Sequence, residues 1–300
     1  MRAAATERPH DPLYGRGEVT IDEADLPPDA EALLAEVQET LRSPRYQPPM
    51  LPRVATEVLA MAQDPNVAVD KMVQVLGTDP VLAGRVLARV GSASMSGGRA
   101  PVRSLREAVT RLGMKLIRDL VLEAAMTMRV FRSPVYQGAM EAVRAHSVFV
   151  AELSRKVCQY TAVDAEYAFL AGLLHDVGVA GALLVATERG RKLEPTVLWC
   201  ALDRVHGEAS ETMARLWSFP AELTMVLRAH HEVEIGGYAH PLAAALAVAD
   251  AMATERGRGA ADGAGDRTAA RRLDKARAAL GFDARIAALI DKEAQKLLAG

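Results

Sequence analysis

The second half of this chain places histidines and aspartates on the apolar faces of amphipathic helices. His146, for example, shares one helical stripe with Val150, Leu153 and Val157. A buried polar side chain is costly unless it is paired or binds a metal ion. This pattern constrains the fold, because the helices have to bring these polar groups together.

The same inward phase recurs further along the chain. His206 is in phase with Ala209 and Met213, His230 with Leu223 and Val226, and Asp250 with Leu242 and Leu246. The pair His175-Asp176 ends the apolar stretch AEYAFLAGLL, and Gly178 is predicted to stop that helix. The predicted metal ligands are therefore His146, His175, Asp176, His206, His230, His231 and Asp250. Imidazole and carboxylate groups hold metal ions that activate water. Because His230 fits its stripe better than His231, the latter could contact a bound ligand instead.

The rest of the chain also indicates helices. Half of its 300 residues are hydrophobic but only 4% are aromatic, and alanine and leucine dominate, which favours helices over sheets. Before residue 138, helical periodicity covers residues 29–43, 53–64, 69–79, 79–92, 104–113 and 115–130. Residues 281–298 form a further amphipathic helix with Asp283 as its N-cap, and the glycine-rich segment 257–267 is predicted to be a mobile loop. We predict an all-α fold without strands of useful length.

Composition argues against several classes of protein. A formal net charge of −2 predicts no general attraction to nucleic acid or to anionic membranes. Cys158 and Cys200 form no metal-binding motif and indicate a reducing compartment. With neither a transmembrane segment nor a secretory signal recognisable, we expect a cytoplasmic protein that does not contact membranes.

The order of these residues resembles that of a known group of enzymes. H…HD…H…H…D, with AGLLHDVG around the HD pair, resembles the HD superfamily of metal-dependent phosphohydrolases. Over residues 50–255 the resemblance is closer to the bacterial HDOD family, in MLPRVATEVLAMAQDP, TDPVLAGRVLARVGSAS and VRSLREAVTRLGMKLIRDLVL, and then in EYAFLAGLLHDVG, VHGEASETMARLWSFP and RAHHE.

This resemblance implies a domain organisation. A partly disordered segment with a short helix would cover residues 1–45. A two-lobed HDOD domain would follow over 46–255, with an N-terminal helical lobe at 46–135 and an HD-like lobe at 136–255. A flexible loop and the C-terminal helix would occupy 256–300.

The resemblance also implies a site that binds one or two divalent ions, such as iron or manganese, or that has lost them. His146, His175, Asp176 and Asp250 would form the first metal site, and His206 with His230 or His231 the second. Asp176 would bridge the two ions and orient the attacking hydroxide as the catalytic residue. Hydrolases of the related HD-GYP type carry a lysine where this chain has Val179, and a GYP loop where it has Gly237-Tyr238-Ala239.

Two classes of function follow. The first is a signalling module that acts through unidentified protein partners or through a bound nucleotide or cyclic dinucleotide. The second is a metal-dependent phosphohydrolase acting on a nucleotide or cyclic nucleotide. Without the lysine, less positive charge would oppose the developing charge on a phosphate, so we favour the signalling module.

Overall fold

The computed structural model describes residues 26–48, 53–62, 67–78, 80–91, 104–125, 133–217, 219–259 and 269–299. These residues are helical apart from their turns, loops and one short hairpin, so the predicted all-α class is confirmed. The chain divides into two compact units.

The smaller unit spans residues 47–132 and 216–218. It contains α2 (Arg53–Ala62), α3 (Val69–Gly77), α4 (Pro80–Gly91) and α6 (Leu105–Ala125). The other three helices all pack against α6, which is kinked at Gly113, where φ is +77°. The Ser104 hydroxyl accepts a hydrogen bond from the Glu107 N–H at 3.1 Å, as expected of an N-cap.

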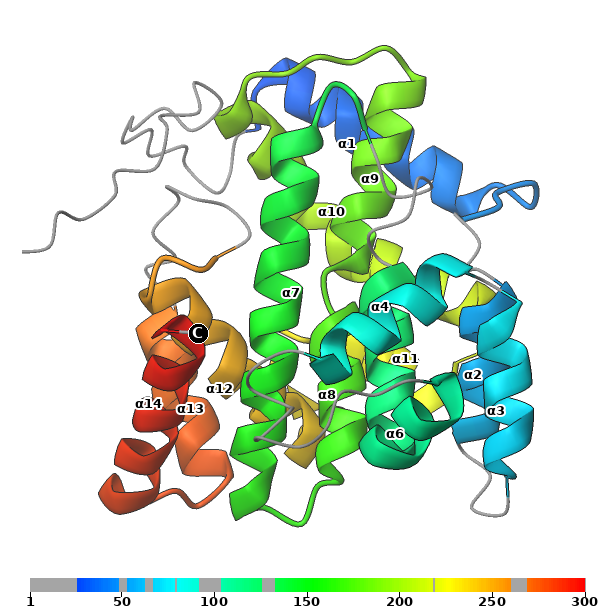
Figure 1. The fold of residues 1–300 in the computed structure, drawn as a ribbon. Helices are drawn as coiled ribbons and strands as arrows, with labels where there is room; N and C mark the ends of the chain where they lie inside the picture. The colour runs from blue at the N-terminus through cyan, green and yellow to red at the C-terminus, as the bar shows by residue number, and fades with distance from the viewer. Residues whose placement is uncertain are drawn as a thin grey trace, which may run out of the picture. The chain divides into compact units, whose positions relative to one another are not determined.

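The larger unit spans residues 1–46, 133–215 and 219–300. It contains α1 (Pro28–Arg42), α7 (Gln137–Val157), the 3-10 turn η2 (Cys158–Tyr160), α8 (Ala165–Leu174), α9 (Val177–Glu188), α10 (Pro195–Leu216), α11 (Ala221–Arg228), the antiparallel strands β1 (Glu234–Ile235) and β2 (Tyr238–Ala239), α12 (Pro241–Glu255), α13 (Ala269–Ala279) and α14 (Ala284–Ala299). The long helix α7 packs against α8, α9, α12 and α14, and α13 lies on α12 (Figure 1).

Three helices of this unit are buried on almost every side. The residues of α8, α9 and α12 are nearly all apolar and inaccessible to solvent. The stretch Tyr167–Glu188 is long and apolar enough to cross a membrane, but 94% of its apolar 18-residue window is buried inside the fold. It is broken at His175-Asp176 and forms the centre of the core, which explains its hydrophobicity.

Some local expectations were wrong. Gly178 does not stop a helix but lies in the first turn of α9. A side chain there would place Cβ 2.1 Å from the carbonyl oxygen of His206, so glycine allows α9 to approach α10. Helix α13 was not predicted, and the short hairpin at 234–239 was also missed. Of the segment expected to be a loop, residues 260–267 lie outside the described residues.

Candidate metal centre

All seven predicted ligand residues converge within the larger unit. His146 lies on α7, His206 on α10 and Asp250 on α12. The pairs His175-Asp176 and His230-His231 were expected on helices. They lie instead in the turns that follow α8 and α11. A turn lets two adjacent residues point into one site, which a regular helix does not, because neighbouring helical residues face different directions.

The close approach of α10 to its neighbours depends on small residues beside His206. A Cβ atom on Gly207 would lie 2.5 Å from the carbonyl oxygen of Arg228, at the end of α11. The Ser210 hydroxyl donates to the carbonyl oxygen of His175 at 2.7 Å and accepts from the Gly178 N–H at 2.9 Å. These contacts fix the His175-Asp176 turn against α10.

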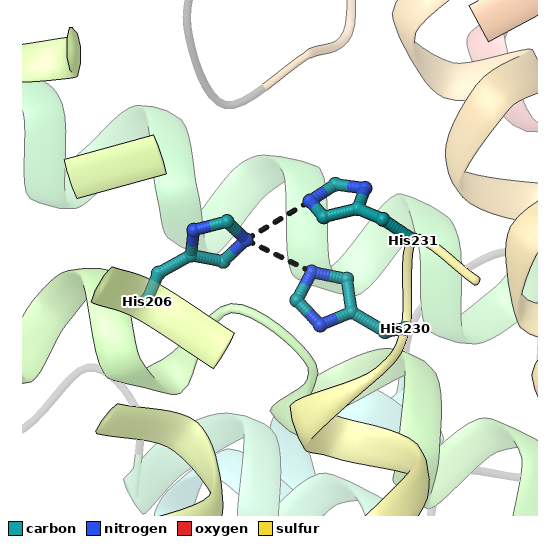
Figure 2. A group of neighbouring side chains, drawn as sticks. All are labelled: His206, His230 and His231. Carbon is teal, nitrogen blue, oxygen red and sulfur yellow. Dashed lines mark hydrogen bonds between the residues drawn. The ribbon is translucent and has the colours of Figure 1, made fainter. Parts of the chain in front are cut away.

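The ligand atoms form two groups, each with its three atoms within 4.8 Å of one another. The first contains His146, His175 and Asp176, and the second His206, His230 and His231 (Figure 2). In the first group, the Nε2 atoms of His146 and His175 lie 3.0 Å apart. In the second, His206 Nε2 lies 3.1 Å from His230 Nε2 and 2.9 Å from His231 Nε2.

Asp176 lies between the two groups. Its Oδ2 atom is 3.5 Å from His146 Nε2 and 3.4 Å from His175 Nε2. Its Oδ1 atom is 3.4 Å from His230 Nε2 and 3.9 Å from His206 Nε2. One carboxylate therefore faces both groups, which is the arrangement expected of a residue that bridges two ions.

Backbone carbonyls fix the tautomers of four histidines. The Nδ1 atoms of these rings lie 2.7–3.0 Å from carbonyl oxygens, namely His146 from Arg258, His175 from Gly172, His206 from Leu202 and His230 from Leu227. Because a carbonyl only accepts, each Nδ1 carries a proton and each neutral ring presents an Nε2 lone pair to the site. Histidines that bind metals are typically oriented in this way.

The Nε2 lone pairs of neighbouring rings face each other across 2.9–3.1 Å and therefore have to share a proton or a metal ion. In the metal-free protein, burial opposes protonation of His146, but its hydrogen bond with Asp250 and the charge of Asp176 raise its pKa. Burial likewise opposes protonation of His230, while the bond with Asp176 raises its pKa. Burial lowers the pKa of His175 to about 4, so that ring stays neutral as an acceptor.

The two carboxylates stay ionised. Burial favours the protonated form of Asp176, but the surrounding histidines, His175 and His230 foremost, hold its pKa well below the usual value. Asp250 is also buried, yet the hydrogen bond with His146 and the charge of Arg272 depress its pKa strongly. A cluster of neutral Nε2 atoms and buried carboxylates therefore fits a divalent cation.

Solvent reaches the cluster on one side. The His231 side chain is 40% exposed, whereas those of the other six residues are at most 8% exposed. His231 thus marks the side from which an ion or a ligand would enter.

Arg272 on α13 is a site residue that was not predicted. Its Nη2 atom lies 3.0 Å from Asp250 Oδ2, which is ion-pair distance although the angle is not that of a hydrogen bond. Its Nη1 atom lies 2.5 Å from His231 Nδ1. No sequence pattern distinguishes Arg272 as a site residue, because the segment AARRLDKARAA is rich in charged residues and follows a glycine-rich segment.

The family is settled by the length of the sequence match. The family model of the HDOD domain matches residues 49–233, more than half of the chain. This chain belongs to the HDOD family. The resemblance inferred from the motifs is thereby confirmed, while Asp250 and Arg272 lie beyond the matched residues. No curated protein is detectably similar to the chain.

Solved structures share the HDOD fold. A provisionally named metal-dependent phosphohydrolase from Shewanella amazonensis is 21% identical, with a TM-score of 0.67 over 84% of this chain and 90% of that one. An HDOD domain protein of unknown function from Geobacter sulfurreducens is 22% identical, with a TM-score of 0.64 over 90% and 97%. A provisionally named signal transduction protein from Marinobacter aquaeolei is 20% identical, with a TM-score of 0.67 over 93% and 66%. At these identities the similarity establishes the fold alone.

Proposed function

We propose that this chain is an HDOD signalling module whose histidine-aspartate cluster binds a divalent ion such as manganese or iron. The observation that carries the proposal is the 3.0 Å approach of His146 Nε2 to His175 Nε2, with both Nδ1 atoms bonded to backbone carbonyls. Two neutral rings held in this tautomer turn their Nε2 lone pairs toward each other, which is favourable only when the two lone pairs share a proton or a metal ion. A cation site explains why the fold buries this pair.

The first ligand group is the better candidate for a bound ion. His146, His175 and Asp176 are all buried, and Asp250 Oδ1 lies a further 3.3 Å from His146 Nε2. These residues would supply two nitrogen and two oxygen donors. A divalent ion held there would provide a Lewis acid for a water molecule or a phosphate oxygen. Arg258, through its carbonyl oxygen, orients the ring of His146.

The module would act by binding rather than by rapid turnover. Val179, at the position where HD-GYP hydrolases carry a lysine, is 3% exposed and offers no charge to the site. Arg272, a cation that faces the cluster, is engaged with Asp250 and His231. We therefore propose that a nucleotide or cyclic dinucleotide, or a signalling protein, contacts the exposed side at His231 and that the output passes to a protein partner.

A phosphohydrolase is the second candidate. It is favoured by Asp176, whose two oxygens face the two ligand groups separately. A carboxylate in this position can hold two ions and orient a hydroxide between them. In this reading Asp176 is the catalytic residue.

A metal titration tests the proposal. The purified chain, stripped with a chelator, is titrated with Mn²⁺ by calorimetry, and bound metal is counted by elemental analysis after gel filtration. We expect at least one tightly bound ion per chain, and at least a tenfold loss of affinity in His175→Ala. The matched control is His240→Ala, since His240 is the N-cap of α12 and lies outside both ligand groups. Wild type that retains no ion, or loss of affinity in the control alone, would refute the proposal.

A further inference from the structure

Arg272 contacts the one histidine of the cluster whose Nδ1 is not bonded to a backbone carbonyl in the described structure. The residue lies on α13, which packs against α12, and its side chain is 11% exposed. Its guanidinium reaches both Asp250 Oδ2 and His231 Nδ1. The fold therefore places a permanent positive charge beside the second ligand group.

The contact with His231 determines where that ring carries its proton. A guanidinium only donates hydrogen bonds, so His231 Nδ1 has to accept. The proton of the neutral ring is then on Nε2, opposite to the arrangement in the other four histidines. His231 Nε2–H donates to His206 Nε2 at 2.9 Å (Figure 2). In this state neither nitrogen of His231 has a lone pair free for a metal ion.

We propose that Arg272 is a positioning residue that keeps His231 out of the ligand set, so that the cluster holds one ion rather than two. An ion bound by His206, His230 and His231 would need the Nε2 lone pair of His206, which now accepts the hydrogen bond from His231 Nε2–H. Such an ion would also lie close to the guanidinium charge of Arg272. The second ligand group can bind an ion only when Arg272 no longer contacts His231. This inference rests on the proposed metal-binding function and assigns its stoichiometry to α13.

The tautomers can be measured in the metal-free wild-type protein without any variant. Long-range ¹H–¹⁵N correlation spectra distinguish Nδ1–H from Nε2–H imidazoles. We expect His231 as Nε2–H, with His175 and His206 as Nδ1–H. His231 observed as Nδ1–H would overturn the proposal, whether or not the protein binds metal.

Stoichiometry provides the second test. Mn²⁺ is titrated into wild type, into Arg272→Met and into Arg271→Gln, which removes an exposed charge from the same helix. We expect one ion per chain in wild type and in Arg271→Gln, and two in Arg272→Met. Adding His231→Ala to Arg272→Met should return the count to one, which shows that the gain depends on the released ring and not on lost charge alone.

The outcomes separate this inference from the function on which it rests. One ion in both wild type and folded Arg272→Met, or two in both, leaves metal binding intact and refutes the role of Arg272. A gain that persists after His231→Ala also refutes it. No ion in any variant refutes the proposed metal-binding function and with it the stoichiometric role, while the tautomer of His231 still reports whether Arg272 sets its proton.

Discussion

The Ser210 hydroxyl donates a hydrogen bond to the carbonyl oxygen of His175 across 2.7 Å, linking α10 to the turn that carries two ligands. The Ser210 hydroxyl oxygen also accepts a hydrogen bond from the Gly178 N–H, so one small side chain satisfies two buried backbone groups. Position and stability of the candidate site are therefore coupled at this residue.

Replacing this serine should destabilise the fold and disturb the site together. Ser210→Ala leaves the His175 carbonyl and the Gly178 N–H without their partner, and each unsatisfied buried group costs about 1–3 kcal/mol. We expect the free energy of unfolding, measured by urea denaturation, to fall by at least about 1 kcal/mol. Ser43→Ala, which removes an exposed bond to the Arg45 N–H, should change it little. Equal effects of the two substitutions would contradict this role of Ser210.

A methyl group beside His206 should also be poorly tolerated. In Gly207→Ala the new Cβ would lie 2.5 Å from the Arg228 carbonyl oxygen, so α10 and α11 would have to move apart. We expect a loss of about 1–3 kcal/mol of stability and weaker Mn²⁺ binding, measured by thermal unfolding with and without the ion. Gly84 on α4 is the control, because a Cβ there meets no atom within 4 Å. Gly84→Ala should leave stability unchanged or raise it by about 0.5–1 kcal/mol.

Metal affinity should rise with pH. The pKa of His146 is raised, so below that pKa the ring holds a proton on the Nε2 that an ion needs. The pKa of His175 is about 4, so above this pH the ring is already neutral and has no proton to release when an ion binds. At a pH between the pKa of His175 and that of His146, binding of an ion at the first ligand group should release one proton, from His146. Affinity should then rise about tenfold per pH unit.

Calorimetry in buffers of different ionisation enthalpy counts the released protons directly. About one proton per ion is expected near pH 6. Binding without proton release would show that His146 is neutral in the metal-free protein, contrary to its raised pKa.

Hydrolysis of cyclic dinucleotides should be weak or absent even with Mn²⁺ supplied. Val179 is buried and uncharged, and Arg272 is engaged with Asp250 and His231. The described part of the site therefore offers little further positive charge to the transition state of phosphoryl transfer. Product formation from a cyclic dinucleotide is followed by chromatography. Steady-state turnover that Asp176→Ala abolishes would make the chain a phosphohydrolase.

Much of the fold could be predicted because its signal is local. Helical periodicity and N-caps such as Ser104 and Asp283 act within a few residues, and the described structure confirms both caps. Helix α13 was missed because its mean hydropathy is low and only Ala269, Leu273 and Ala276 are buried. Gly178 was misread as a helix stop because its need for glycine arises from His206 and Ser210 on another helix.

The histidines and aspartates of the candidate site could be predicted from the sequence, but Arg272 and the tautomers of the histidines could not. The seven side chains were found from their phase on apolar stripes and from the HDOD resemblance. The tautomers could not be found, since they depend on carbonyls far along the chain, such as that of Arg258 for His146. Arg272 meets His231 across 41 positions, and no local pattern encodes that contact.

Whether the cluster is a cation site is tested most directly by anomalous diffraction. Crystals of the chain soaked in Mn²⁺ are measured on both sides of the manganese absorption edge, which locates the ion without reference to activity. We expect an anomalous peak within coordination distance of His146 Nε2, His175 Nε2 and the Asp176 carboxylate. Manganese confined to exposed carboxylates, with the Nε2 atoms of His146 and His175 still about 3.0 Å apart, would contradict the proposed function.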